Sequence, residues 1–530
     1  MRVTFDKAFY QPGDVMKLRL NPPENSTNWS LKILKFDEAM ISIPATNSLE
    51  ISVKIPMNFH GGYGIDVEFL DSSGKKIEET HRGIMTLKTW LERPIYGYLT
   101  DFHPRRFDIE RTMDFLAQYH INALQYYDWM YDYGKLVYEE GEKYRDAWSR
   151  KRLISNQVLK DLISAGHKKN IFSMAYVSIY GGSMELALKN PKWALYIREA
   201  DKWRILDFHG KIAIMNINPD CGWTKFLLRE CEKTISFGFD GIHFDQYGYP
   251  KDGTAAMLKE GKYIPYPTSK GFCELINFFK KHLKVPIFFN YVNNWPEEIQ
   301  QNTQTDAVYI EPWECCPTYM SLFETIRKAN KKTGKNVILA AYIEGNYVNS
   351  ILLTDATIFS SGGQRLEIGE YKRILTGPYF PQNYVLMNDQ LAAHLLDYYD
   401  FFARYQDFFQ GEFVEIKDAD RIVENGWSFP RPGKIWVSAL KTSWGIMLNF
   451  VNFVGIRNSL WRNKSSSPHE FTNINISIPA EFVDSNNPSF FFASADGKIK
   501  LSRLEAQKSG EKYILSIPYL WYWSSILIKN

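Results

Sequence analysis

The sequence predicts a (β/α)8 barrel that is flanked by two β-sandwiches. First, at roughly 100–200 residues per domain, 530 residues are enough for several domains. Second, compact apolar runs alternate with long helical periods from about residue 95 to residue 411, which is typical of β/α units around a parallel sheet. Third, short runs of alternating apolar and polar residues, separated by Pro, Gly, Asn and Ser turns, precede and follow this region. We therefore expect domain boundaries that give residues 1–90, 91–411 and 412–530.

The central region carries seven clear strand candidates and a weaker eighth. They are residues 95–102, 122–129, 171–178, 240–247, 286–293, 307–314, 336–344 and, more weakly, 366–369. Helical periods are expected over residues 111–120, 156–169, 221–238, 269–284, 318–334 and 389–410. Eight strand–helix units in about 320 residues fit a barrel with some long loops. A doubly wound sheet is the alternative, although no G-x-G-x-x-G or P-loop motif follows any strand.

Composition and charge exclude several functional classes. There are 63 Lys and Arg against 60 Asp and Glu, a net charge of +3 without a dense basic tract, so we expect no nucleic-acid or membrane partner. No apolar run approaches the length of a membrane span. The five cysteines are scattered and form neither a disulfide framework nor a zinc pattern. The first residues contain no visible signal peptide, so we expect a cytoplasmic monomer, or alternatively a secreted protein whose leader was removed.

Aromatic residues are unusually abundant, at 15% of the chain, and many lie beside Asp, Asn or Glu. Large β-rich cores would explain this abundance. A sugar-binding cleft would also explain it, because aromatic faces stack on pyranose rings while acids and amides bind the hydroxyl groups. Composition alone leaves both explanations open.

Carboxylates follow most of the predicted barrel strands. In a barrel of this kind the active site lies at the C-terminal ends of the strands. Five acids that converge on one end would repel one another, an arrangement that is tolerated where it adjusts the pKa values of acids and bases. The five acids are Asp101, Asp128, Asp245, Glu311 and Glu344.

Other chemistries lack their residues. Only His103 and His243 lie near these strand ends and no H-E-x-x-H motif occurs, so we expect neither a catalytic metal nor any cofactor. A Ser-His-Asp enzyme would need a G-x-S-x-G motif, which is missing, and no histidine is placed to activate Cys315 or Cys316. Glycoside hydrolysis by paired carboxylates is therefore the leading chemistry.

Two of the acids are suited to the two roles that glycoside hydrolysis requires. Asp245 ends an apolar strand and is the candidate nucleophile, with His243 and Gln246 beside it as hydrogen-bonding partners for sugar or carboxylate. Glu311 is the candidate acid, because the apolar Pro312 and Trp313 that follow it would favour its protonated form.

Several segments resemble glycoside hydrolase family 66, which comprises dextranases and cyclising glucanotransferases. They are INALQYYDWMYDYG (121–134), GFDGIHFDQYG (238–248), DAVYIEPWE (306–314) and the long run GGQRLEIGEYKRILTGPYFPQNYVLMNDQLAAHLLDYYDFFARYQDFF (362–409). The resemblance covers about residues 96–410. It implies an immunoglobulin-like domain, a (β/α)8 barrel and a C-terminal β-sandwich, in that order.

The resemblance also implies a retaining double displacement on α-1,6-linked glucans. It assigns the nucleophile to Asp245 and the acid/base to Glu311. The family's YDW segment, whose Asp supports the sugar in subsite −1, matches Tyr127, Asp128 and Trp129. We expect stacking platforms at Trp129 and Trp313. Further substrate-binding candidates near strand ends are Tyr176, Asn290, Asn293 and Glu344.

The sequence departs from the family pattern around both acids. Phe244 and Gln246 frame the nucleophile position, where relatives usually have Gly and Thr, and the residue before Trp313 also varies, being Pro312 here. These departures leave the choice of substrate open. The cyclising members carry an extra carbohydrate-binding module in the barrel, for which about 320 residues leave no room, so we expect a dextranase-like endo-hydrolase of α-1,6-linkages in dextran or isomalto-oligosaccharides. Transglycosylation and a glycan-binding protein without turnover are the alternatives.

Overall fold

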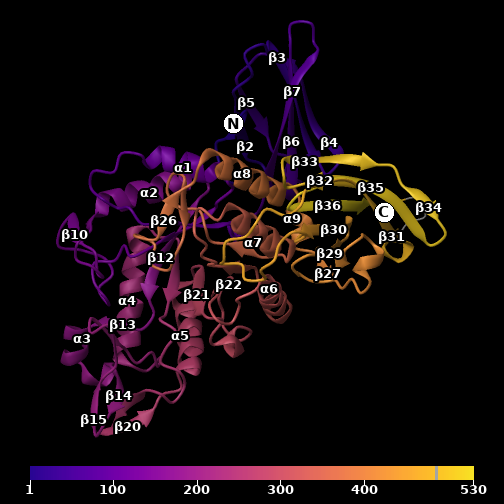
Figure 1. Cartoon of the computed structure of the whole chain (residues 1–530). Coiled ribbons are helices and arrows are strands. Elements are labelled where there is room, and N and C mark those ends of the chain that lie inside the picture. Colours follow the sequence, from indigo (N-terminus) through magenta and orange to yellow (C-terminus); the bar gives the residue numbers. More distant parts are fainter. Residues whose placement is uncertain (484–487, 530) are drawn as a thin grey trace.

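Three groups of elements are arranged around a central barrel in the computed structural model, which describes residues 1–483 and 488–529. In Figure 1 the N-terminal strands stand at the top, the barrel occupies the centre and left, and the C-terminal strands, in orange and yellow, lie at the right. The order of these groups matches the predicted order. The domain boundaries at residues 90 and 411 stay predictions.

The central sheet has eight parallel strands in the order β24-β23-β22-β21-β18-β12-β9-β8. It closes into a barrel through the backbone N–H of Tyr98, which donates to the carbonyl of Ile368 at 3.2 Å. The strands are β8 (Tyr96–Leu99), β9 (Ala123–Tyr126), β12 (Phe172–Ser178), β18 (Gly241–Asp245), β21 (Ile287–Val292), β22 (Val308–Glu311), β23 (Val337–Leu339) and β24 (Gln364–Arg365). Each of the seven clear candidates contains one strand, and the eighth strand lies just before the predicted 366–369.

Helices cover the outside of the barrel. They are α1 (Ile109–Gln118), α2 (Asn156–Lys168), α4 (Gly222–Phe237), α5 (Thr268–Leu283), α6 (Tyr319–Thr333), α7 (Val348–Ser360) and α8 (Asp389–Arg404), the last followed by α9 (Gln406–Phe409). Between β21 and β22 the described chain has only the short 3-10 turn η3 (Glu297–Ile299). Helix α7 was not predicted, because every residue from Ser350 to Ser360 is buried and the helix therefore lacks a polar face.

Long excursions interrupt the barrel on one side. A sheet of order β15-β14-β19-β20 projects from it at the lower left of Figure 1, and it was not predicted. The excursions contain β10 (Lys143–Arg145), β11 (Leu153–Ser155), β13 (Gly181–Ser183), α3 (Met184–Lys189), η2 (Pro191–Trp193), β14 (Leu195–Glu199), β15 (Lys202–Ile205), β16 (Asp207–Phe208), β17 (Ile212–Ile214), β19 (Ala256–Lys259), β20 (Lys262–Pro265), β25 (Arg373–Leu375) and β26 (Tyr384–Leu386).

The N-terminal region consists of two antiparallel sheets over a common core. One has the order β1-β2-β5 and the other β4-β3-β6-β7. Their bounds are β1 (Val3–Phe5), β2 (Val15–Leu20), β3 (Asn28–Lys35), β4 (Glu38–Thr46), β5 (Glu50–Lys54), β6 (Gly61–Leu70) and β7 (Lys76–Thr86), with the 3-10 turn η1 (Trp90–Glu92) leading into the barrel. Alternation of buried and exposed residues in β2 shows why this strand forms: Met16, Leu18 and Leu20 face the core. The immunoglobulin-like assignment stays a prediction.

The C-terminal region has a large sheet of order β27-β29-β30-β36-β32-β33, with β28 paired to β29, and a small one of order β31-β35-β34. Their bounds are β27 (Glu412–Val414), β28 (Gly426–Trp427), β29 (Ile435–Thr442), β30 (Gly445–Asn452), β31 (Phe471–Pro479), β32 (Ser489–Ser494), β33 (Lys498–Leu504), β34 (Gln507–Ser509), β35 (Lys512–Leu520) and β36 (Trp523–Lys529), with 3-10 turns η4 (Ala419–Arg421) and η5 (Ala480–Phe482). One face of the large sheet packs on the barrel, where Trp436, Met447 and Trp523 join the barrel core.

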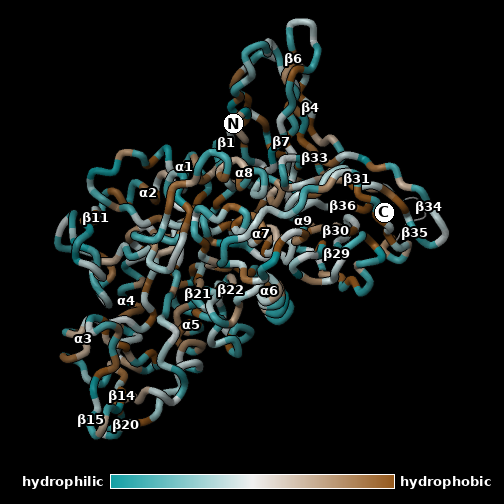
Figure 2. Tube along the Cα trace, in the orientation of Figure 1, coloured by the Kyte–Doolittle hydropathy of each residue, from teal (hydrophilic) through white to brown (hydrophobic). Residues whose placement is uncertain are grey.

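Apolar side chains are concentrated inside this assembly. In Figure 2 hydrophilic residues are frequent along the outward side of α6, which carries four lysines and arginines after Thr325, while apolar segments lie within the barrel. Among the described residues no helix is both long and apolar enough to cross a membrane.

Candidate active site

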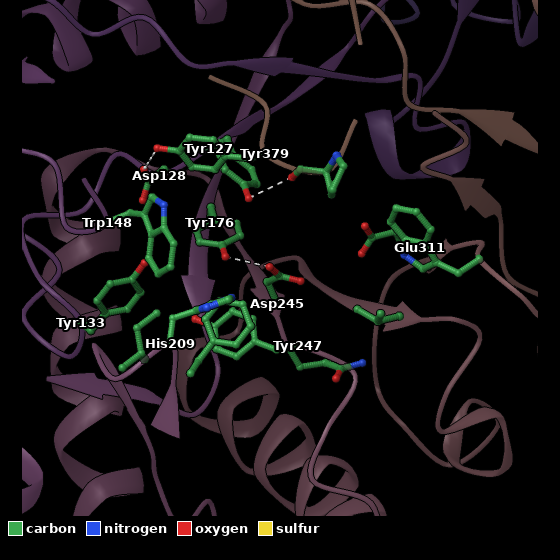
Figure 3. Close-up of a pocket in the computed structure, with 16 residues that line it drawn as sticks. Tyr127, Asp128, Tyr133, Trp148, Tyr176, His209, Asp245, Tyr247, Glu311 and Tyr379 are labelled. Atoms are coloured by element: carbon green, nitrogen blue, oxygen red, sulfur yellow. Dashed lines mark hydrogen bonds between the residues drawn. The ribbon is translucent and has the colours of Figure 1, made fainter. Parts of the chain in front are cut away.

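A pocket of about 310 Å³ opens at the C-terminal end of the barrel (Figure 3). Three of the five predicted acids, Asp128, Asp245 and Glu311, line it. The full lining consists of Tyr127, Asp128, Tyr133, Trp148, Tyr176, Phe208, His209, Ile212, Asp245, Gln246, Tyr247, Val292, Glu311, Trp313, Pro378 and Tyr379. Aromatic rings therefore surround a small number of carboxylates, the arrangement expected of a sugar-binding cleft.

Asp245 and Glu311 share one hydrogen-bond donor. Asp245 is the last residue of β18 and Glu311 the last of β22, and Asn290 lies on β21 between them. The Asn290 Nδ2 donates to Asp245 Oδ1 at 2.8 Å and to Glu311 Oε2 at 2.9 Å. Because the two hydrogens of an amide nitrogen diverge by about 120°, the two carboxylate oxygens lie roughly 5 Å apart.

Burial makes the two acids unequal. Desolvation, with the charge of Asp245 as the next contribution, raises the pKa of Glu311 to about 7, against hydrogen bonds from Asn290, Tyr342 and Trp313. Desolvation also raises the pKa of Asp245, but hydrogen bonds from the Tyr176 hydroxyl, at 2.7 Å to Oδ2, and from Asn290 oppose the shift. Near neutral pH the site can therefore hold one ionised and one protonated carboxyl group.

Asp128 is fixed at the rim of the pocket. Its backbone has φ 54°, and its Oδ2 accepts from Arg152 Nη2 at 2.6 Å and from the Tyr379 hydroxyl at 3.3 Å. Desolvation raises the pKa of Asp128 to about 6, while the charge of Arg152 opposes this shift. A buried acid with a guanidinium partner can accept hydrogen bonds from sugar hydroxyl groups without reorientation.

Tyrosines form one wall of the pocket. The ring of Tyr127 packs between Tyr176, at a centroid distance of 4.6 Å, and Phe380, at 4.2 Å. The Tyr127 hydroxyl donates to the carbonyl of Pro378. Figure 3 shows Tyr176 with its hydroxyl directed at Asp245, as the hydrogen bond requires. Tyr127 and Tyr176 thus lie where the sequence predicted substrate-binding residues, and their role stays a prediction.

The opposite wall was missed by sequence analysis. Phe208 stacks on Tyr247 at 4.4 Å, and Trp148 packs against Phe208 at 5.9 Å and His209 at 6.0 Å. Trp148 lies in the long excursion after β9 and Phe208 in the one after β12, far beyond the strand ends on which the sequence prediction rested, so no pattern singled them out. Tyr247 follows Asp245 by two positions and Tyr342 follows β23, so extending each strand-end motif by a few residues would have found both. The missed lining residues Tyr133, Ile212 and Tyr379 also come from such loops.

Two other candidates line the pocket in different ways. Trp313 is partly exposed there, as a stacking platform requires. Gln246 is 1% exposed, and its side-chain amide donates to the carbonyls of Asn290 and Trp295, so its nitrogen is occupied by the loop that follows β21. The predicted bond from Gln246 to sugar therefore has only the amide oxygen available, which already accepts from the N–H of Gly248.

Trp129 and His243 were predicted wrongly. Trp129 is fully buried against Phe239, at 4.6 Å, and donates to the carbonyl of Tyr176, so it cannot stack on sugar. His243 lies deeper in the barrel than Asp245, fully buried, and its Nδ1 shares a hydrogen bond with the Tyr96 hydroxyl at 3.0 Å. Burial lowers the pKa of His243 to about 3, so this imidazole is a neutral core residue.

Asn293 and Glu344 do not line this pocket, and their binding role stays a prediction. The Asn293 Oδ1 accepts from the backbone N–H of Cys315, so this side chain holds two loops together outside the pocket lining. Glu344 is exposed and does not line the pocket. Asp101 lies apart as well, in a separate hollow with His103. The expected convergence of all five acids is therefore wrong: three share the pocket, while Asp101 and Glu344 lie outside it.

The described residues hold no group of three or more His, Cys, Asp or Glu side chains that could bind a metal ion. The three acids of the pocket instead have amide, hydroxyl and guanidinium partners.

A model of glycosyl hydrolase family 66 matches residues 5–527. A cycloisomaltooligosaccharide glucanotransferase of Niallia circulans is 22% identical over 706 aligned positions, which cover the whole of this chain and 72% of that protein. A second protein of that name from the same organism is 27% identical over 382 positions, covering 66% of this chain and 39% of that protein.

Solved structures share the fold. The crystal structure of a Paenibacillus sp. cycloisomaltooligosaccharide glucanotransferase complexed with cycloisomaltoheptaose has a TM-score of 0.89 at 19% identity and covers 99% of each chain. An α-amylase from Geobacillus thermoleovorans complexed with acarbose has a TM-score of 0.55 at 10% identity, over 83% of this chain and 99% of that one. These likenesses extend the match from the barrel to the flanking strands.

Proposed function

Because this chain belongs to glycosyl hydrolase family 66 and is thus a glycoside-active enzyme, we propose that it hydrolyses α-1,6-glucosidic linkages of dextran or isomalto-oligosaccharides by a retaining mechanism. Asp245 attacks the anomeric carbon while Glu311 protonates the leaving oxygen. Glu311 then removes a proton from water, which attacks the anomeric carbon and breaks the bond between sugar and Asp245.

The shared amide of Asn290 is the observation that carries this proposal. Retaining enzymes have carboxyl groups about 5–5.5 Å apart, whereas inverting enzymes leave more room for a water molecule. The bonds of 2.8 and 2.9 Å from one nitrogen, Asn290 Nδ2, keep the carboxylates near the retaining spacing. The pKa of Glu311, about 7, also suits a group that donates and later accepts a proton near neutral pH.

The choice of α-1,6-glucan is supported by the names of relatives, which refer to isomalto-oligosaccharides. The same names include glucanotransferase and so favour a second candidate, transfer of the glycosyl group to another sugar. The alignment with the first relative runs over 706 positions, more than the 530 residues of this chain, so that relative has segments without a counterpart here. This difference supports hydrolysis over cyclisation.

The test is product analysis on dextran, with starch and pullulan in parallel, for the wild type and Asp245→Asn. We expect isomalto-oligosaccharides of mixed length from dextran alone, with no product from the variant. Because an amide cannot attack the anomeric carbon, the loss in kcat should be at least about 10³-fold.

Other outcomes would change the proposal in defined ways. Activity that survives in Asp245→Asn would show that another residue is the nucleophile. Longer or cyclic products would replace hydrolysis by transfer, and cleavage of another glucan would replace the substrate. Binding of isomalto-oligosaccharide without products at any pH would identify a glycan-binding protein.

A further inference from the structure

A loop from the C-terminal region reaches the active site. Residues 453–470 connect β30 to β31 and run along the chain that follows Glu311 (residues 312–319). The backbone N–H of Tyr319 donates to the carbonyl of Ser459 at 3.0 Å, and Thr318 and Leu460 form an isolated β-bridge. The Nε1 of the fully buried Trp461 donates to the carbonyl of Cys316 at 2.6 Å.

The same loop is also anchored to the start of α7. The Ser350 hydroxyl donates to the carbonyl of Asn463 at 2.7 Å and accepts from the N–H of Ser465 at 2.9 Å. Anchors on two neighbouring barrel elements hold the intervening Arg462 in one place, because the residues on both sides of it are fixed.

Arg462 contacts the segment that carries the acid/base candidate. Its Nη2 donates to the carbonyl of Pro312, the residue directly after Glu311. Its guanidinium lies over two indole rings, 4.5 Å from the ring centroid of Trp313 and 4.3 Å from that of Trp461. Trp313 lines the pocket and donates a hydrogen bond to Glu311.

The guanidinium also acts on Glu311 through its charge. Burial lowers the pKa of Arg462, and the charges of Tyr342 and Glu311 oppose that shift, so Arg462 and Glu311 interact electrostatically. The other groups whose charges act on the Glu311 carboxyl or are acted on by it are Asp245, Tyr127, Tyr309 and Tyr342. Among these groups Arg462 supplies the positive charge and Asp245 the opposing negative charge.

We propose that Arg462 is a positioning residue of this active site, contributed from the C-terminal strands to the barrel. It holds the Trp313 ring against the pocket, and its charge favours the ionised form that Glu311 must adopt when the glycosyl intermediate reacts with water. This inference rests on the proposed function, and it assigns to the C-terminal region a role in catalysis as well as in stability.

The test compares Arg462→Gln and Arg462→Lys with wild type on the glucan that the wild type cleaves. Arg462→Gln removes the charge, so Glu311 becomes harder to ionise and the basic limb of the kcat/KM profile should move to higher pH. Loss of the stack should lower kcat/KM by roughly tenfold. Arg462→Lys keeps the charge but not the planar stack, so KM should rise several-fold while the basic limb stays near its wild-type position.

Arg457→Gln is the matched control, because Arg457 is exposed on the same loop and the substitution makes the same change of net charge. Its kcat/KM and its pH profile should equal those of the wild type. An effect on stability alone would lower the melting temperature of Arg462→Gln without moving the basic limb, and that result would overturn the inference.

Three further outcomes are distinguishable. If Arg462→Gln does not fold, the KM of Arg462→Lys becomes the test. A KM equal to that of the wild type then overturns the inference. If the wild type cleaves no glucan at all, the proposed function fails, and the inference that rests on it fails with it. If the wild type cleaves the glucan and Arg462→Gln has the same kinetics and pH profile as the wild type, the inference is overturned while the proposed function stands.

Discussion

At the scale of single residues, the proposed mechanism depends on the ionisation of two carboxyl groups that share the amide of Asn290. In that mechanism Asp245 is ionised to attack, and Glu311 is protonated to act as the acid. Burial raises the pKa of both, and the charge of Asp245 adds to the shift of Glu311, which reaches about 7.

The first prediction concerns pH. Because Glu311 loses its proton as the pH rises through about 7, kcat/KM should fall above that pH, and protonation of Asp245 should lower it at acid pH. Steady-state rates on dextran between pH 3 and pH 10 measure both limbs. With a glucoside whose leaving group needs no proton, Glu311→Gln should abolish the basic limb of the profile. A basic limb that persists in this variant would show that another group causes it.

The second prediction concerns Asn290→Ala. Removing the amide takes a hydrogen bond from both acids, and since these bonds lower both pKa values, the acid limb of the profile should move to higher pH. We expect kcat to fall by about 10–10³-fold, because two charge-assisted bonds are lost. Asn302, an exposed residue after η3, offers the control Asn302→Ala. A wild-type pH profile in Asn290→Ala would contradict a role in setting the two pKa values.

The third prediction separates Trp129 from Trp148. Trp129→Phe leaves the carbonyl of Tyr176 without its buried donor and should lower the free energy of unfolding by about 1–3 kcal/mol, with KM within twofold of wild type. Trp148→Ala removes part of the pocket wall and should raise KM roughly 2- to 10-fold with little change in stability. Denaturant unfolding and steady-state kinetics measure both. The reverse pattern would return Trp129 to the binding site.

At the scale of elements, glycines allow α8 to pack directly on the N-terminal sheet. Gly62 and Gly64 of β6 and Gly83 of β7 leave room for α8, and a Cβ atom on Gly83 would lie 2.1 Å from the carbonyl oxygen of Asp400. Arg82 forms a buried ion pair with Asp400 beside this contact. In Figure 1 the helix lies directly below these strands.

The fourth prediction follows from this contact. Gly83→Ala places a methyl group on helix backbone that cannot move aside, so it should destabilise the protein by about 2–4 kcal/mol. Gly141→Ala is the control, because Gly141 is exposed and the nearest atom to its added carbon belongs to the ring of Tyr138, at 3.3 Å. Thermal unfolding compares the two. Equal melting temperatures would mean that α8 and the sheet separate easily.

At the scale of the whole molecule, one apolar core crosses the predicted domain boundaries. It includes Phe9 and Met85 from the N-terminal strands, the barrel interior, and Trp436 and Trp523 from the C-terminal sheet. Smaller cores lie within each flanking region. Elements that share a core lose their packing together when it is exposed to water.

The fifth prediction is that the full chain unfolds in a single calorimetric transition that includes the C-terminal strands. Trp436→Ala, in the shared core, should lower the midpoint for the whole molecule, because it removes a fully buried side chain. Ile517→Ala, in the separate C-terminal core, is the matched comparison. Two resolved transitions in the wild type would show that the regions unfold independently.

Much of the architecture followed from periodicity. Seven barrel strands and the helices that cover them were predictable, because a strand buried on both faces reads as an apolar run and an amphipathic helix repeats every 3.6 residues. Helix α7 was not, because it is buried all round. The sheet built from β14, β15, β19 and β20 was also missed, since its strands are short and come from two separate loops.

The sequence by itself determined where the strands end, and therefore that Asp245 and Glu311 lie at the C-terminal end of the barrel, because the C-terminal ends of parallel strands gather there. Only the tertiary structure decided which neighbours share the pocket. His243 is buried because it lies deeper in the barrel than Asp245, and Trp129 is buried because the chain after β9 turns toward the core. Trp148 and Phe208 reach the site from long excursions after β9 and β12, and Arg462 reaches it from the C-terminal strands; such contacts depend on chain folding that no local pattern encodes.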